Sequence, residues 1–328
     1  MVRIFLILIT IVVFFSNCNN GNEASPYAEL LTKPPYATLT DSIHDDSKNP
    51  DLYYRRGVLL RKNNNLQPAL ADFRKAWELD KKEEYAVSVS SVLSAQPDTA
   101  IDFINAALKQ FPGSIALKLY LVQLYASQQK TDEAMKICSD IISQQPNQLD
   151  ALEMKAELLE RKNDTTGSIK ILEQAYRFAP FDEQLCYNLA NKYAQTKNAK
   201  AIKLCDSLIQ TDSSQPEPYY FKGVYYENVN NRSKAISFFD QAIIHDYTFL
   251  DAHMDKGKIF YEEKKYNEAI KIFELALEIS HNYADTYFWL GQCQEALGQK
   301  EEAKLNYQRA YGLDKSFVEA KEAADRLK

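Results

Sequence analysis

A repeat of about 34 residues constrains this sequence more than any other feature. A small residue opens an apolar segment at eight places: Ala69, Ala100, Ala134, Ser168, Ala201, Ala235, Ala269 and Ala303. The successive spacings are 31, 34, 34, 33, 34, 34 and 34 residues. A fixed period of this size is typical of arrays in which each unit packs on its neighbours. The spacing therefore predicts an array of similar units between about residue 50 and residue 315.

Each unit has the pattern of two helices. Four residues after the small residue stands a mostly larger side chain: Phe73, Ile104, Cys138, Leu172, Cys205, Phe239, Phe273 or Tyr307. Three residues further on stand Ala76, Ala107, Ile141, Ala175, Leu208, Ala242, Ala276 and Ala310. Spacings of four and three place these side chains on one face of a helix. About twelve residues before the small residue come Gly57, Gly223, Gly257 and Gly291, with Ala156 and Ala190 in two middle units, and we expect a preceding helix there.

Composition supports an all-α fold. Gly and Pro number only 9 and 11 of 328 residues, which disfavours the turn-rich sandwiches and barrels and the doubly wound sheets. The formal net charge is −6, from 39 basic and 45 acidic residues, and the basic residues form no long run. Phosphate binding needs clustered positive charge, so we expect no nucleic-acid partner.

The set of positions resembles the tetratricopeptide repeat, a 34-residue pair of antiparallel helices, and its clearest copy is Tyr287, Leu290-Gly291, Ala303, Tyr307 and Ala310. The resemblance implies an all-α, right-handed superhelix, an α-solenoid of eight helix-turn-helix repeats over residues 50–315. We expect residues 27–49 to form an N-terminal half-repeat cap. Residues 316–328 are expected to form a C-terminal capping helix with Ser316 as its N-cap. Unit two is three residues short, which predicts a shortened first helix.

In this family the fifth and ninth positions of the first helix line a concave groove. The candidate peptide-binding residues are Tyr54, Leu119, Glu153, Tyr187, Tyr220, Met254 and Phe288 at the fifth position, and Glu157, Asn191, Lys258 and Gln292 at the ninth. Exposed rings supply contact area and amides bond a peptide backbone. The alternative is that the tyrosines only stiffen the array. The lysine-and-asparagine clamp of some family members is absent, and Glu153, Glu157 and Glu160 favour a neutral or basic ligand segment.

The N-terminus resembles a bacterial lipoprotein signal. Arg3 precedes an apolar stretch of 12 residues, Ile4 to Phe15, which is short for a membrane-spanning helix. Cys18 follows, and the resemblance implies a signal over residues 1–17, lipidation of Cys18 and a flexible tether over residues 18–26. The alternative is a plain signal peptide or an uncleaved anchor. We expect a lipid-anchored protein of the bacterial cell envelope, on the periplasmic or surface face of the outer membrane.

The sequence carries no motif for catalysis. The four histidines, His44, His245, His253 and His281, have no partner at catalytic spacing, and no glycine-rich phosphate loop occurs. The cysteines after Cys18, at Cys138, Cys186, Cys205 and Cys293, lack the spacing of a metal site. We therefore expect no enzyme activity, no cofactor and no metal. A disulfide between Cys186 and Cys205 is a further hypothesis, since the two are expected to face each other within one helix pair.

These observations favour a membrane-tethered, non-catalytic scaffold that binds a segment of another cell-envelope protein in its groove. The alternative is a lipoprotein that binds a glycan or peptidoglycan fragment by stacking on Tyr187, Tyr220, Tyr261 and Phe288. An end helix, with Phe317 and Val318, is a candidate contact for a homo-oligomer.

Overall fold

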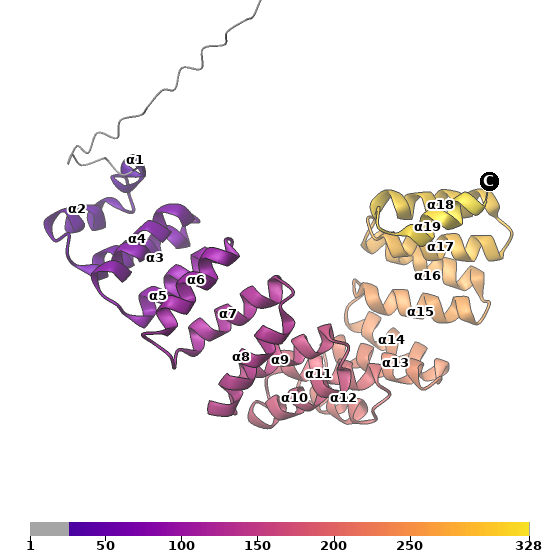
Figure 1. Ribbon diagram of the computed structural model, residues 1–328. Coiled ribbons are helices and arrows are strands. Elements are labelled where there is room, and N and C mark those ends of the chain that lie inside the picture. The colour runs from indigo at the N-terminus through magenta and orange to yellow at the C-terminus, as the bar shows by residue number, and fades with distance from the viewer. Residues whose placement is uncertain (1–25, 328) are drawn as a thin grey trace, which may run out of the picture. The chain divides into compact units, whose positions relative to one another are not determined.

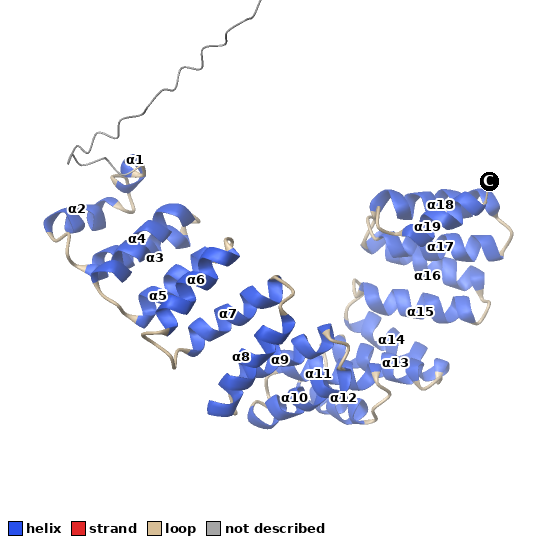
Figure 2. Cartoon of the chain, in the orientation of Figure 1, coloured by secondary structure: helices blue, strands red, loops and turns tan. Residues whose placement is uncertain are grey.

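The computed structural model describes residues 26–327, and every regular element in that range is a helix (Figures 1 and 2). Eight consecutive helix pairs, repeats 1 to 8, make up most of the chain. They are α3 (Pro50–Lys62) with α4 (Leu66–Leu79), α5 (Glu83–Leu93) with α6 (Pro97–Leu108), α7 (Ile115–Ser127) with α8 (Thr131–Gln144), α9 (Leu149–Arg161) with α10 (Thr165–Phe178), α11 (Glu183–Gln195) with α12 (Lys200–Thr211), α13 (Glu217–Asn228) with α14 (Arg232–His245), α15 (Leu250–Glu262) with α16 (Tyr266–Ile279), and α17 (Ala284–Ala296) with α18 (Lys300–Leu313). The predicted all-α architecture of eight helix-turn-helix repeats is confirmed.

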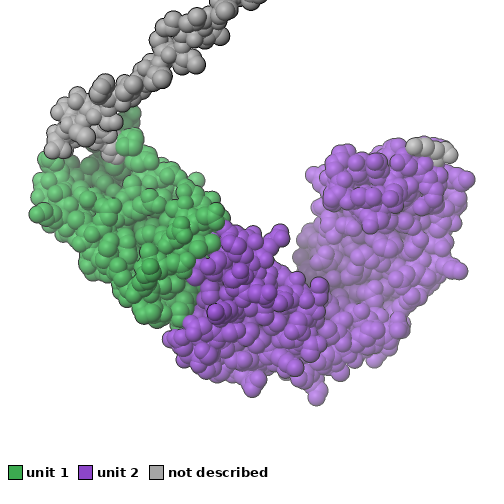
Figure 3. Space-filling view, in the orientation of Figure 1, with its two compact units in different colours: residues 1–120 green, residues 121–328 purple. Residues whose placement is uncertain are grey.

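The chain divides into two compact units, residues 1–120 and residues 121–328 (Figure 3). The first unit contains α1 (Ala28–Leu31), α2 (Ala37–Asp45), repeats 1 and 2, and the start of α7. The second contains the rest of α7, α8, repeats 4 to 8, and a final helix, α19 (Val318–Arg326). The predicted signal, Cys18 and most of the tether lie outside the described residues.

In repeats 1, 6, 7 and 8, the glycine of the first helix packs closely against an aromatic ring of the second helix. This contact explains the constant spacing between the two residues. In repeat 7, a Cβ atom added to Gly257 would lie 2.5 Å from the ring of Phe273, which is fully buried. Repeat 8 has the same arrangement, with 2.6 Å between such an atom on Gly291 and the ring of Tyr307. The equivalent pairs in repeats 1 and 6 are Gly57 with Phe73 and Gly223 with Phe239. A ring on the second helix therefore occupies the space that a side chain on the first would need.

Repeats 2 to 5 fill the same space differently. The residue on the first helix is larger than glycine and its partner is smaller than an aromatic ring. The pairs are Ser88 with Ile104, Val122 with Cys138, Ala156 with Leu172, and Ala190 with Cys205, and all eight residues are buried. Because a protein interior is packed to nearly constant density, an increase on one helix is matched by a decrease on the other.

The turn inside the repeat has one conformation throughout most of the array. One residue has a positive φ in seven of the eight repeats: Asn64, Gln129, Asn163, Lys197, Asn230 and Lys264, at 59° or 60°, and Gly298, at 78°. The N–H group of the next residue donates to a carbonyl five positions earlier, as from Lys265 to Phe260 at 2.9 Å. This is the Schellman ending of a helix, which satisfies carbonyl groups that the helix leaves free.

Repeat 2 is the exception in both its length and its turn. Its first helix, α5, has 11 residues, and α5 ends at Ser94 with an ordinary right-handed backbone. Ser90 donates its hydroxyl hydrogen to the carbonyl of Ala86 within the helix, at 2.8 Å. The shortened first helix that the sequence predicts for unit two is confirmed.

The first unit begins with a cap that is fixed by a buried ion pair. Arg56 of α3 and Asp72 of α4 are joined by two hydrogen bonds of 2.8 Å, and the two residues are only 6% and 5% exposed. The same guanidinium donates to the hydroxyl of Thr40 at 2.9 Å, which links α2 to repeat 1. Burial raises the pKa of the Asp72 carboxyl, and the Arg56 charge opposes that rise.

The final helix covers repeat 8, but its start differs from the prediction. Ala320, Ala323 and Ala324 of α19 are buried against repeat 8. Ser316 does not cap the helix, because its hydroxyl and N–H group both donate to Oδ1 of Asp314, at 2.7 and 2.8 Å. The serine closes the turn before α19, which begins two residues later. Two other repeat boundaries have the same turn, at Asp212 with Ser214 and Asp246 with Thr248.

Candidate ligand-binding face

The predicted groove residues lie on the first helices of the repeats, and within each unit we call this side the first-helix face. In the second unit, the fifth-position rings pack against neighbouring repeats. The ring of Tyr187 lies 6.0 Å from that of Phe221 in the next first helix. Tyr220 contacts Phe239 in its own repeat at 5.7 Å and Phe249 at the start of the next at 5.2 Å. These rings are half-buried, and their packing supports the structural alternative that the sequence leaves open.

The same arrangement occurs at both ends of the array. Tyr54 lies 5.9 Å from Phe73 in its own repeat and 5.1 Å from Tyr85 in repeat 2. Phe288 lies 4.8 Å from Phe317, just before α19. Aromatic pairs at these separations stabilise a fold by about 0.5–1.5 kcal/mol beyond the area they bury. The four fifth-position rings, Tyr54, Tyr187, Tyr220 and Phe288, therefore connect their repeats to the element that follows.

The two apolar fifth-position residues that are not aromatic, Met254 and Leu119, differ from the rings. Met254 is 3% exposed, and its sulfur atom lies 3.3 Å from the hydroxyl of Thr286, so Met254 belongs to the core and offers no surface to a ligand. Its position in the repeat is as predicted, but an unbranched thioether is flexible enough to turn into the space between α15 and α17. Leu119 is half-buried in the first unit.

The ninth-position side chains keep polar atoms nearer the surface. Lys258 donates to Asp255 at 3.0 Å, and the amide oxygen of Gln292 accepts from the Tyr261 hydroxyl at 3.2 Å. Glu157 is exposed and accepts from Arg161 at 2.7 Å. Asn191 is half-buried and makes no side-chain hydrogen bond within residues 26–327. Among the predicted residues, Glu157 is the exposed one, and the other ninth-position side chains are half-buried.

Carboxylates give the first-helix face of the second unit its electrostatic character. Burial, with the charges of Asp255 and Glu262 nearby, raises the pKa of Glu227 to about 7. Burial and the Asp255 charge also raise the pKa of Asp251. In repeat 4, burial and then the charges of Asp182 and Asp150 raise the pKa of Glu153. A half-buried carboxylate whose charged form is disfavoured gains from a cation brought close to it.

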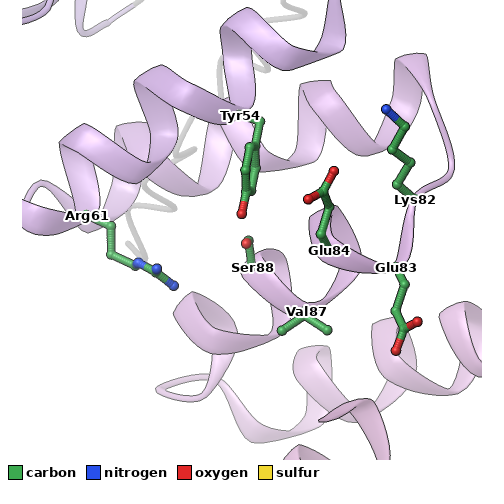
Figure 4. Close-up of a pocket in the computed structure, with 7 residues that line it drawn as sticks. All are labelled: Tyr54, Arg61, Lys82, Glu83, Glu84, Val87 and Ser88. Carbon is green, nitrogen blue, oxygen red and sulfur yellow. The ribbon is translucent and has the colours of Figure 1, made fainter. Parts of the chain in front are cut away.

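The first unit contains a pocket between α3 and α5, which we call the α3–α5 pocket (Figure 4). Its volume is about 600 Å³, and it is lined by Tyr54, Arg61, Lys82, Glu83, Glu84, Val87 and Ser88. Tyr54 is the only residue of the predicted groove that contributes to it. The other lining residues could not be predicted from the sequence, because they meet only where the first helices of repeats 1 and 2 approach each other.

The cysteine, histidine and carboxylate side chains of the described range form neither a disulfide nor a cluster suited to a metal ion. Cys138, Cys186, Cys205 and Cys293 are buried free thiols, so the hypothesis of a Cys186–Cys205 disulfide is wrong for this structure. Burial raises the pKa of Cys138 to about 11 and that of Cys205 to about 12. No group of three or more His, Cys, Asp or Glu side chains in residues 26–327 is placed to hold a metal ion.

The fold and the face described above define an all-helical repeat protein of the kind that binds other proteins. Family models agree: tetratricopeptide repeat models match residues 92–158, residues 50–83 and residues 284–317, and a TPR repeat model matches residues 257–298. The chain is a tetratricopeptide repeat protein. A protein-interaction scaffold is the class of function that this fold suggests, and the family is generally non-catalytic.

Solved structures share the fold at low sequence identity. A tetratricopeptide repeat protein from Parabacteroides merdae ATCC 43184 is similar over 74% of this chain and 98% of that one, with 18% identity and a TM-score of 0.62. The Cut9–Hcn1 hetero-tetramer of the APC/C is similar over 89% of this chain and 59% of that one, with 16% identity and a TM-score of 0.51. A search of curated proteins gave no match. Within the described range, none of the helices has the length and apolar character needed to cross a membrane.

Proposed function

We propose that this protein is a membrane-tethered scaffold of the bacterial cell envelope. It binds an extended, neutral or basic segment of another envelope protein along the first-helix face. The observation that carries the proposal is a set of carboxylates on that face whose pKa values are all raised: the half-buried Glu153 and Glu227, and the more exposed Asp251. A lysine or arginine from a partner would offset the cost of burying these charges, and the ninth-position amides would bond the partner's backbone.

The tether is the second part of the proposal. It rests on the N-terminal pattern of Arg3, an apolar stretch and Cys18. Acyl chains on Cys18 would hold the protein at the outer membrane, since each buried CH₂ contributes about 0.8 kcal/mol. Self-association is proposed only through Val318, which is 53% exposed, because Phe317 already packs on Phe288.

The structure favours a protein segment over a glycan as the ligand. Stacking on a sugar requires the free face of an aromatic ring. Tyr187, Tyr220 and Phe288 are occupied by the ring contacts described above. Tyr261 lies 5.5 Å from Tyr266 and 5.4 Å from Trp289, so it too is packed.

In-cell crosslinking followed by purification of the full-length protein tests the proposal. The variant combines Glu153→Gln, Glu157→Gln and Asn191→Ala, which changes the ligand-facing polar groups and leaves the packed rings in place. The control combines Glu133→Gln and Glu274→Gln on the second helices α8 and α16, where both side chains are exposed. We expect one envelope protein to crosslink to the wild type and the control, and at least tenfold less of it to the variant.

Two results would contradict the proposal. Equal recovery with the variant would remove the first-helix face from the interaction. Recovery of no envelope protein by the wild type would remove the scaffold function itself. The tether is measured separately: Cys18→Ser should release the protein from the membrane fraction, and a protein that stays bound has a different anchor.

A further inference from the structure

The α3–α5 pocket brings together polar groups whose bonding capacity is not used within the fold. Neither the Tyr54 hydroxyl nor the Ser88 hydroxyl makes a hydrogen bond within residues 26–327. Figure 4 shows the two pointing toward each other at the centre of the pocket. Both hydroxyls line the open pocket, so a ligand there can supply the hydrogen bonds that the fold leaves unmade.

Two charged side chains at the pocket, Arg61 and Glu84, form no ion pair within the described chain. Arg61 uses one N–H group to bond Ser91 at 3.0 Å and lies over the ring of Phe73, but no carboxylate of the described chain pairs with it. Glu84, on the first turn of α5, has no basic partner in the same range. The two line one pocket without forming an ion pair with each other.

The other two charged residues of the pocket, Lys82 and Glu83, do not neutralise Arg61 or Glu84. Lys82 is held by Asp80 at 3.3 Å and lies over the ring of Tyr85 at 5.4 Å, and Figure 4 shows it directed away from the centre. Glu83 also points outward in that view. The interior of the pocket therefore presents a guanidinium at one wall, a carboxylate at the other and two hydroxyls between them.

We propose that the α3–α5 pocket binds a peptide segment that carries both an acidic and a basic side chain. The acidic group pairs with Arg61, the basic group pairs with Glu84, and the backbone between them bonds Tyr54 and Ser88. A ligand with one sign of charge would pair with one of these exposed groups and lie close to the like charge of the other, which selects against it. The cavity of about 600 Å³ is large enough for a short segment of chain. The inference rests on the proposed function, because it assumes that the ligand is part of a protein.

The test uses the full-length protein and synthetic peptides in place of the natural partner. One pool contains blocked glycine hexapeptides with one Asp and one Lys at every spacing and in both orders. The comparison pools replace these two residues with Asn and Gln, with two Asp, or with two Lys. We expect the mixed-charge pool to bind at least tenfold more tightly than each of the others, as measured by isothermal titration calorimetry.

Variants locate the binding. Arg61→Gln and Glu84→Gln should each weaken binding of the mixed-charge pool about tenfold. Arg74→Gln, an equal loss of charge on the exposed side of α4, should leave it unchanged. Ser91→Ala removes the hydrogen bond from Arg61 and leaves the charge in place. This variant therefore separates the effect of the Arg61 charge on binding from the effect of its hydrogen bond to α5. The charge swap Arg61→Glu with Glu84→Arg should restore binding, because the pool contains both orders.

Equal binding of all four pools, no measurable binding, or an Arg61→Gln variant that binds like the wild type would overturn the assignment. These failures are distinct from failure of the proposed function. If an envelope protein still crosslinks through Glu153, Glu157 and Asn191, only the ligand chemistry of the first unit is wrong. If the peptides bind as expected and no envelope protein is recovered, the ligand assigned to the α3–α5 pocket is supported and the proposed scaffold function is wrong.

Discussion

Repeats 1, 6, 7 and 8 differ from repeats 2 to 5 in the way that their helices meet. The former pair a glycine with an aromatic ring, as at Gly257 and Phe273, whereas the latter pair Ala, Ser or Val with Leu, Ile or Cys, as at Ala156 and Leu172. The turns and helix lengths of most repeats are nevertheless alike. The helix pair depends on the combined volume at this contact, and no single residue type is required there.

The largest effect is expected from removing a ring. Phe273→Ala should lower the free energy of unfolding by about 3–5 kcal/mol, because the fully buried ring leaves a cavity against Gly257. Cys205→Ala in repeat 5 should cost about 1 kcal/mol, because only a small apolar group is lost. Hydrogen exchange of α15 and α16, and of α11 and α12, measures each effect in its own repeat. Equal losses would show that the two kinds of contact are energetically alike.

A smaller effect is expected from adding one methyl group. Gly257→Ala should destabilise repeat 7 by about 1–2 kcal/mol, since overpacking by roughly 1–3 kcal/mol exceeds the helix propensity gained. Combining it with Phe273→Leu reproduces the contact of repeat 4. The double variant should be more stable than the sum of the two single changes predicts, by at least about 1 kcal/mol in chemical denaturation. Simple additivity would break the argument from combined volume.

Repeat 6 also contains Glu227, whose carboxyl pKa is shifted further from its ordinary value than that of the other carboxylates on the first-helix face. Its pKa is raised to about 7 in the folded protein, against about 4.3 for an unperturbed glutamate. The folded state therefore holds a proton that the unfolded state has released, and stability falls as pH rises from about 5 to 7. Glu227→Gln should remove this fall and stabilise the protein at pH 8 by on the order of 1 kcal/mol, after solvent screening. Thermal unfolding of both proteins at pH 5 and pH 8 measures it, and parallel changes would exclude Glu227 as the cause.

The smallest effect concerns the turn, which both groups share. Lys264→Gly and Asn163→Gly should each stabilise the protein or leave it unchanged, by about 0–1 kcal/mol, because glycine adopts a positive φ without strain. Replacing Lys264 should stabilise the protein more than replacing Asn163, because asparagine adopts a positive φ more readily than lysine. The reverse change, Gly298→Lys, serves as the control and should destabilise. If the changes in the free energy of unfolding for Asn163→Gly and Lys264→Gly differ by much more than about 1 kcal/mol, the turns of repeats 4 and 7 are not equivalent.

The sequence predicted the fold well because the fold depends on spacing. The positions of Gly291, Ala303 and Tyr307 define which side chains face each other, and the structure places Gly291 against Tyr307. The turns were harder to predict, since Gln129, Lys197 and Lys264 have no strong preference for a positive φ. The positive-φ positions recur every 33 or 34 residues from Gln129 to Gly298, and this recurrence is the signal that would have found them.

The candidate site was less predictable for a physical reason. A repeat position indicates the side of the helix that a residue occupies, but it does not say whether the adjacent repeat covers that residue. Tyr220 and Met254 both hold the fifth position, yet one donates from its hydroxyl to Asp255 at 2.9 Å and the other is buried. Arg61 and Glu84 share no repeat position, and only the approach of α3 to α5 brings them to one pocket.

The matched volumes inside each repeat have a consequence for recombination. A first helix with glycine cannot be exchanged for one with alanine or valine unless the second helix is exchanged too, because the ring at Phe239 or Tyr307 leaves no room. Whole repeats of this chain should therefore be better units for duplication, deletion or transplantation than single helices. Gene rearrangements that cut between repeats should therefore yield folded chains far more often than those that cut within one.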